Sequence, residues 1–238
     1  MTDPFSLRMH ASAQKAHDAF HACADRFREF YIRAPRKWAK STFCLQEASL
    51  VCWAKPYARV PYAAPTKEMV KEFIIPIGRE IMEGAPKRLR AEWKPSESAF
   101  VYPNGSRVIV AGCDLGGYKR LRGPKADLCI VDEAGFIDEL DTVINAVLLG
   151  QVITTGGRIL IVSTPADPPA HPFTARCRKA QRDGNEFHAT IYDATHIPMA
   201  AVDEYKRVLG GDSPAWRREY LAEHVVERLQ GDGHDVGV

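Results

Sequence analysis

The sequence predicts an α/β fold: a mostly parallel sheet flanked by helices, with a small helical lid near the C-terminus. Short apolar runs alternate with longer segments in which apolar residues recur every three or four positions, and this alternation is typical of a parallel sheet with helical connections. With 238 residues, of which 45% are hydrophobic, the chain can bury one sizeable core. We therefore expect one domain over residues 1–226, with the lid at about 193–226, and a flexible tail or truncated linker at 227–238.

Each element follows from its local pattern. Buried strands are expected at five apolar runs, residues 30–33, 59–63, 127–131, 158–163 and 187–191. Apolar residues three or four apart predict connecting helices at 41–54, 67–83, 137–149 and 172–182, and lid helices at 199–209 and 214–226. The turn-forming group Pro103-Asn104-Gly105-Ser106 lies between apolar segments 99–102 and 107–111, and it predicts an inserted β-hairpin.

The composition excludes few classes of function. A net charge of +2 with 26% charged residues is ordinary for a globular protein and does not decide whether the chain binds nucleic acid. Six cysteines without a CxxC pair are expected to be reduced structural thiols. No apolar run reaches the roughly 18 residues that a membrane span needs, so we expect a cytoplasmic protein. Basic residues gather within 33–40, 87–94, 119–125 and 176–182, where contacts with DNA phosphates and a merely solvated face are alternatives.

A basic segment between the first strand and the first helix predicts a phosphate-binding loop of the Walker A type. It reads Ala34-Pro35-Arg36-Lys37-Trp38-Ala39-Lys40-Ser41 and is followed by Thr42. In such a loop, backbone N–H groups and the helix N-terminus face the phosphates, a lysine reaches the β- and γ-phosphates, and a hydroxyl binds Mg²⁺. Lys40 and Ser41 are the candidates for these two roles, so ATP and Mg²⁺ are the expected cofactors.

Ala39 departs from the common pattern, which has glycine at this position. A Cβ atom here crowds the loop if the backbone needs a positive φ. Two alternatives therefore stay open at this point. In one, the loop deviates and Lys37 contacts the phosphates; in the other, the segment is a basic turn that binds no nucleotide.

Two acids follow the apolar run 128–131, as in the Walker B segment of P-loop enzymes. Asp132 is expected to hold Mg²⁺ through water, and Glu133 to act on the attacking water as its base or to orient it. The alternative is a strand that ends in solvated acids. Ser163 and Thr164 end another strand at the same predicted edge of the sheet, where they either sense the γ-phosphate or cap a turn.

The order of these motifs resembles the ATPase domain of large terminase subunits from tailed phages and related gene-transfer particles. The resemblance extends from about residue 14 to residue 226. Besides the two Walker segments, it rests on Gln14, Ala64-Pro65-Thr66-Lys67, Asn104-Gly105-Ser106, Leu121-Arg122-Gly123, Ile161-Val162-Ser163-Thr164-Pro165 and Trp216-Arg217-Arg218-Glu219-Tyr220-Leu221-Ala222-Glu223. It implies that Gln14 reads adenine and that the segment with Ser163 and Thr164 couples hydrolysis to movement.

Arg122 is expected to complete the ATP site of a neighbouring subunit. Arg122 precedes the strand at 127–131, so its guanidinium should lie at the edge of the sheet opposite Asp132 and Glu133. The resemblance implies the same role across a subunit interface. The alternative is a structural arginine that binds loop carbonyls.

The resemblance implies an ATPase that drives double-stranded DNA into a viral procapsid. Such a protein works as a homo-oligomeric ring in the host cytoplasm and on the procapsid, with a portal protein and a small terminase subunit as partners. Family members carry a nuclease domain after this region; we expect it to be absent, as a truncation or a separate chain, and expect no nuclease activity. The alternatives are a non-catalytic nucleotide-binding scaffold or regulatory protein, a helicase-like translocase, and a DNA-binding module.

Overall fold

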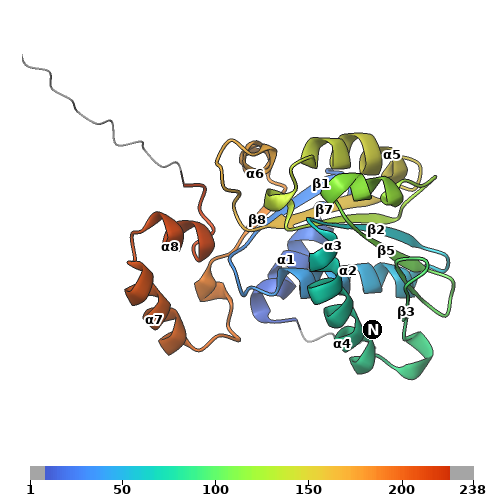
Figure 1. The fold of residues 1–238 in the computed structure, drawn as a ribbon, viewed down its shortest axis with the longest axis horizontal. Helices are drawn as coiled ribbons and strands as arrows, with labels where there is room; N and C mark the ends of the chain where they lie inside the picture. The colour runs from blue at the N-terminus through green and yellow to red at the C-terminus, as the bar shows by residue number, and fades with distance from the viewer. Residues whose placement is uncertain (1–8, 226–238) are drawn as a thin grey trace, which may run out of the picture.

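An eight-stranded sheet runs through the centre of the structure, a computed structural model that describes residues 9–225 (Figure 1). Across the sheet, the strands are β3 (Glu92–Lys94), β4 (Ala99–Val101), β5 (Arg107–Gly112), β2 (Arg59–Ala64), β6 (Leu128–Asp132), β7 (Arg158–Ser163), β1 (Glu29–Arg33) and β8 (Glu186–His188). Six neighbouring strands are parallel to one another: β5, β2, β6, β7, β1 and β8. The remaining two, β3 and β4, form an antiparallel edge. The expected mostly parallel α/β sheet is confirmed.

The central strands are buried along their whole length. Every residue of β6 and β7 is buried, as expected for parallel strands that helices cover on both faces. Asp132 pairs with Val162, and Arg33 pairs with Ser163. The carboxyl ends of β1, β6 and β7 therefore meet at one edge of the sheet.

Helices cover both faces of this sheet (Figure 1). One face packs against α1 (Ala11–Ala22), α2 (Lys40–Ala54) and a continuous helix formed by α3 (Lys67–Met69), η1 (Val70–Ile74) and α4 (Ile75–Gly84). The other packs against η3 (Asp114–Leu121), η5 (Thr142–Leu148), α5 (Leu149–Val152) and α6 (Pro172–Asp183). Two apolar cores result, one on each face. None of the helices within residues 9–225 has the length and apolar character needed to cross a membrane.

The end of the described chain forms the expected helical lid in part. The helices α7 (Met199–Leu209) and α8 (Pro214–Glu219) lie beside the edge of the sheet that ends in β8 (Figure 1). The expected helix at 214–226 is too long, since α8 ends at Glu219 and Ala222 has a left-handed φ of 51°. Residue 226 and the expected tail at 227–238 lie outside the described residues.

Two further boundaries differ from the sequence-based expectation. The strand expected at 187–191 stops at His188, because Thr190 and Asp193 form a capping box that starts η6 (Ile191–Asp193). The helix expected at 137–149 is shifted toward the C-terminus, because η4 (Ala134–Phe136) forms a separate turn directly after β6. The hairpin of β4 and β5 is confirmed, whereas α1 and β3 were not expected from the sequence.

Candidate functional site

The carboxyl ends of the parallel strands surround a cavity of about 620 Å³. Most of the phosphate loop lines it together with side chains that follow β2, β6 and β7. The predicted site residues in its wall are Arg36, Lys37, Ala39, Lys40, Ser41, Thr42, Glu133 and Thr164. Pro65, Thr66, Met69, Phe73, Ile77 and Phe136 complete it. The structure thus brings the two candidate Walker segments together, as the motif order predicts.

Lys40 is held at the centre of this cavity wall. Its ammonium group donates hydrogen bonds to the carbonyl of Pro35 at 3.0 Å and to Oγ1 of Thr164 at 2.9 Å. It also lies 3.2 Å from Oε1 of Glu133. These three contacts direct the lysine side chain into the site, and only 5% of the residue is exposed.

Ser41 and Asp132 place two oxygen donors beside each other. Oγ of Ser41 donates to Oδ2 of Asp132 at 2.6 Å, and the hydroxyl of Tyr62 donates to the same oxygen at 2.7 Å. Burial and the charge of Glu133 raise the pKa of Asp132 to about 6, although Ser41, Tyr62 and Lys40 act to lower it. A cation would relieve this excess of buried negative charge, and hydroxyl and carboxylate oxygens are ligands that Mg²⁺ prefers. These residues therefore fit Mg²⁺.

Glu133 occupies a strained backbone position directly after β6. Its φ and ψ of 48° and 46° are left-handed, a conformation that is costly for residues other than glycine and gathers at functional sites. Oε2 of Glu133 accepts hydrogen bonds from Oγ of Ser163 at 3.3 Å and from the backbone N–H of Thr164 at 3.4 Å. These contacts join the carboxylate that ends β6 to the hydroxyl residues that end β7.

The backbone of the phosphate loop is also left-handed at two residues without a glycine. Lys37 has a φ of 66° and Ala39 a φ of 70°. The crowding expected at Ala39 is therefore real, and this conformation costs an L-residue about 1–2 kcal/mol. The loop nevertheless leads directly into α2, whose N-terminus faces the cavity.

Trp38 fixes the loop to α1 and does not line the cavity. Its side chain is fully buried, and its Nε1 donates to Oγ of Ser12 at 3.0 Å. His10, the N-cap of α1, accepts at Nδ1 from the backbone N–H of Ala13. Its Nε2 therefore donates to the carbonyl of Trp38, at 2.8 Å. Burial lowers the pKa of His10, and nearby His196 lowers it further, although the bond to Trp38 acts in the opposite direction.

The C-terminal segment contacts the loop from the other side. His196 lies ahead of α7, and its Nε2 is 2.9 Å from the carbonyl of Lys37. Arg36 forms an ion pair with Glu219 at 2.6 Å, and its backbone N–H donates to the Glu219 carbonyl at 2.9 Å. The helical lid is therefore attached directly to the phosphate loop.

Gln14, predicted to read adenine, lines neither of the two cavities beside the loop. It is exposed on α1, and its Nε2 donates to Oδ1 of Asp18 at 3.0 Å. A second cavity of about 190 Å³ adjoins the loop and shares Ala39 and Thr42 with the first. The amide side chain in its wall is Gln46 of α2, because the helical rotation of α1 turns Gln14 away.

Arg122 lies far from the cavity of its own chain. It is exposed and follows η3, ahead of β6, and its carbonyl accepts a hydrogen bond from Arg59 at 3.1 Å. The five residues of β6 separate it from the carboxyl edge, a distance of about 16 Å at the usual rise of a strand. Its side chain therefore belongs to the opposite edge of the sheet.

Tyr62, Thr66 and Gln46 contact the site without having been assigned to it from the sequence. Tyr62 bonds Asp132, Thr66 lines the large cavity, and Gln46 lines the small one. Where β2 pairs with β6, Tyr62 lies opposite Ile130. Ile130 is two residues ahead of Asp132 in β6. A tyrosine in an apolar strand does not predict this contact from the sequence, because the contact depends on which strands pair in the sheet.

No protein-family model and no curated protein matches the sequence, but solved structures match the fold. The chain resembles the large terminase of a thermophilic bacteriophage in complex with ADP, with a TM-score of 0.73 at 13% identity over 91% of this chain. A variant of the large terminase ATPase domain of Thermus phage P74-26 gives a TM-score of 0.68 at 18% identity, over 91% of this chain and 94% of that domain.

The large terminase of bacteriophage HK97 has a TM-score of 0.65 at 16% identity over 91% of this chain. The chain spans about half of the full-length terminases, 54% of the ADP-bound protein and 51% of the HK97 protein. The large terminase of the thermophilic phage was also solved in complex with ATP-γ-S. The fold is therefore the one that large terminase ATPase domains have, as the motif order led us to expect.

Proposed function

We propose that the chain is the ATPase of a motor that packages double-stranded DNA into a viral procapsid. The observation that carries this proposal is the meeting of Lys40, Ser41, Asp132 and Glu133 at one edge of the sheet. A binding scaffold needs a lysine and a hydroxyl, but it has no need of a second carboxylate in the wall of the same cavity. The terminase fold supports the proposal.

ATP would bind with its phosphates along the loop from Ala34 to Thr42. The backbone N–H groups and the N-terminus of α2 attract the phosphates, and Lys40 exchanges its contact with Glu133 for phosphate oxygens. Ser41 and Asp132 would hold Mg²⁺, which neutralises phosphate charge when bound. The base would enter the small cavity, where we infer that Gln46, in place of Gln14, offers an amide for recognition.

Hydrolysis would then depend on Glu133. Once Lys40 has moved to the phosphates, the Glu133 carboxylate is free to orient a water and take its proton as the water oxygen attacks the γ-phosphorus. The bond to the β-phosphate oxygen breaks, and ADP leaves with that electron pair. Ser163 and Thr164 contact Glu133, so loss of the γ-phosphate would change these contacts at the end of β7.

The oligomer and its partners extend this proposal. Because Arg122 is exposed at the opposite edge of the sheet, it would complete the site of a neighbour in a homo-oligomeric ring. Arg36 and Glu219 join the loop to the lid, which gives ATP binding a route to movement. We expect a portal protein and a small terminase subunit as partners, and the host cytoplasm and procapsid as location.

Steady-state ATP hydrolysis by the purified chain, with and without double-stranded DNA and over a range of protein concentrations, tests the proposal. We expect specific activity that rises with concentration. Lys40→Ala should abolish it and weaken ATP binding, whereas Lys37→Ala, an exposed lysine of the same loop, should have a smaller effect. A larger effect of Lys37→Ala than of Lys40→Ala would show that Lys37 is the lysine that contacts the phosphates. Nucleotide binding without turnover under all conditions would identify a scaffold instead.

A further inference from the structure

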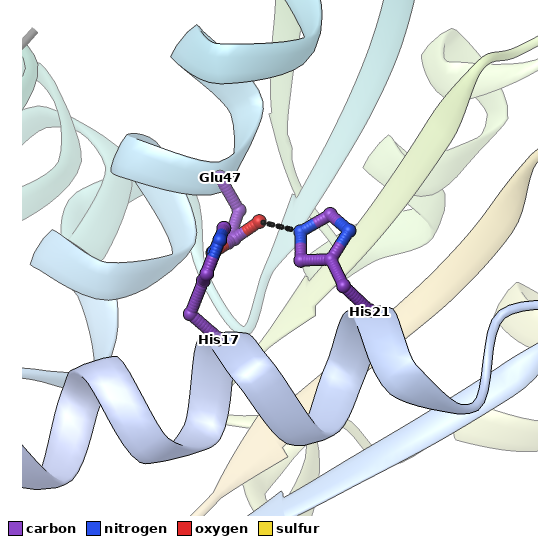
Figure 2. A group of neighbouring side chains, drawn as sticks. All are labelled: His17, His21 and Glu47. Carbon is purple, nitrogen blue, oxygen red and sulfur yellow. Dashed lines mark hydrogen bonds and ion pairs between the residues drawn. The ribbon is translucent and has the colours of Figure 1, made fainter. Parts of the chain in front are cut away.

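Two histidines and a glutamate meet between α1 and α2, in contacts separate from those of the ATP site (Figure 2). His17 and His21 lie one turn apart on α1, and Figure 2 shows both imidazoles beside the carboxylate of Glu47. Nδ1 of His17 is 2.5 Å from Oε1 of Glu47, and Nε2 of His21 is 3.1 Å from Oε2. The cluster therefore joins the N-terminal helix to the helix that starts at Lys40.

The geometry of the cluster suits a metal ion. One ring nitrogen of each histidine and a carboxylate oxygen all lie within 4.8 Å of one another. Zinc binds such atoms at about 2.0–2.2 Å, which places tetrahedral ligands about 3.4 Å apart, so small side-chain rotations would bring all three to one ion. The side chain of His21 is 51% exposed, which leaves a path for entry and an open fourth position for water.

The burial of Glu47 gives a reason for a cation at this place. Its side chain is only 1% exposed, and buried carboxylates are usually paired with a charge or bound to a metal. The two side chains paired with it here are histidines, which are cationic only when protonated. A divalent ion would balance the carboxylate over a wider pH range.

A second group of possible ligands is a poorer site. Cys177, Glu186 and His224 also lie within 4.8 Å of one another. However, Glu186 already forms an ion pair with the buried Arg33 at 2.7 Å. The guanidinium neutralises the carboxylate and would repel a metal ion.

We propose that His17, His21 and Glu47 bind Zn²⁺ and that the ion fastens α1 to α2. Imidazole nitrogens favour zinc over the oxygen-seeking Mg²⁺ of the ATP site. The ion would hold the helix whose N-cap, His10, bonds the phosphate loop at Trp38. It would therefore stabilise the protein and order the loop, whether or not the chain hydrolyses ATP.

Zinc titration of the full chain, stripped of metal and kept in excess Mg²⁺ to occupy the ATP site, tests this proposal. We expect one Zn²⁺ per chain by calorimetry, a higher Tm with Zn²⁺, and the visible absorption of tetrahedral Co²⁺ when cobalt replaces zinc. His21→Ala, at an exposed side chain that should not disturb folding, is expected to weaken Zn²⁺ binding at least about tenfold and to remove the Tm increase.

His188→Ala, at another exposed histidine outside the cluster, is the matched control and should bind Zn²⁺ like the unaltered protein. Circular dichroism checks that both variants are folded. Absence of stoichiometric zinc binding in the unaltered chain would overturn the proposal. Equal zinc affinity in a folded His21→Ala protein would also overturn it.

Discussion

The ammonium group of Lys40 lies 3.2 Å from the carboxylate of Glu133. The lysine expected to bind phosphate and the acid expected to act on water are thus paired with each other. Lys40 also bonds Thr164, so three parts of the site share one cation. If ATP binds as proposed, its γ-phosphate would compete for that cation and release Glu133, so that occupancy of the site would control whether Glu133 can act as the base.

Removal of the Glu133 charge should separate binding from hydrolysis. Glu133→Gln is expected to lower the rate of ATP hydrolysis at least about a hundredfold, the scale of lost general-base catalysis, while ATP binding persists or tightens because Lys40 loses its ion pair. Phosphate release and binding of a fluorescent ATP analogue measure the two effects. Glu80→Gln, an exposed acid on α4, is the control. Near-normal turnover in Glu133→Gln would exclude Glu133 from the mechanism.

Ala39 should respond to substitution according to its positive φ of 70°. Ala39→Gly relieves the left-handed strain but adds freedom to the unfolded chain, so we expect a net gain of about 0.5 kcal/mol in the free energy of unfolding. Ala39→Val adds a branched side chain at this φ, and we expect a loss of about 1–3 kcal/mol together with weaker ATP binding. Urea unfolding measures both. A valine variant as stable as the unaltered protein would contradict the strained loop.

Arg122 should act across a subunit interface. Arg122→Ala and Glu133→Gln subunits are each expected to be nearly inactive, since an arginine finger contributes a factor of roughly 10³ to 10⁵. A mixture should recover part of the activity, because some interfaces then combine an intact Arg122 with an intact Glu133. Arg79→Ala, at an exposed arginine on α4, is the control and should keep full activity. No recovery in mixtures that co-assemble by sizing would assign Arg122 to a structural role.

His224 should make stability depend on pH. Burial lowers its pKa to about 4, with further contributions from Arg33, Arg178 and His188, and both ring nitrogens are buried without a hydrogen-bond partner among the described residues. The unfolded chain therefore binds the proton more readily. This group's stabilisation is complete above pH 6.5 and is lost as the pH falls from about 6.5 to 4.

The expected loss from His224 is about 1 kcal/mol, since the ring is only partly buried and solvent screens its charge. Urea unfolding at several pH values compares the unaltered chain with His224→Leu, which cannot titrate at this position. As the pH falls, the unaltered chain should lose stability relative to the His224→Leu variant. Parallel curves over this window would show that the ring is not held in its neutral form.

Local pattern was enough to predict where the two candidate Walker segments lie in the fold. Lys40 and Ser41 open the helix that follows β1 and the loop 34–39, Asp132 is the last residue of β6, and Glu133 directly follows it. The carboxyl ends of parallel strands meet at one edge of the sheet, so these residues, which are far apart in the sequence, became neighbours in space. The strand at 158–163 agreed to the residue, because Arg158 and Ser163 mark the two ends of its apolar run.

The sequence by itself therefore determined the α/β fold and the residues that meet at the carboxyl edge of the sheet. Only the tertiary structure decided that Gln46, not Gln14, lines the small cavity, that Tyr62 bonds Asp132, and that Lys40 pairs with Glu133. It also brought His17 and His21 to Glu47. The periodicity of apolar residues predicts which face of a helix or strand is buried, but it does not predict which other element packs against that face. Strand order, register and helix rotation choose that partner, and they arise from the packing of the whole chain.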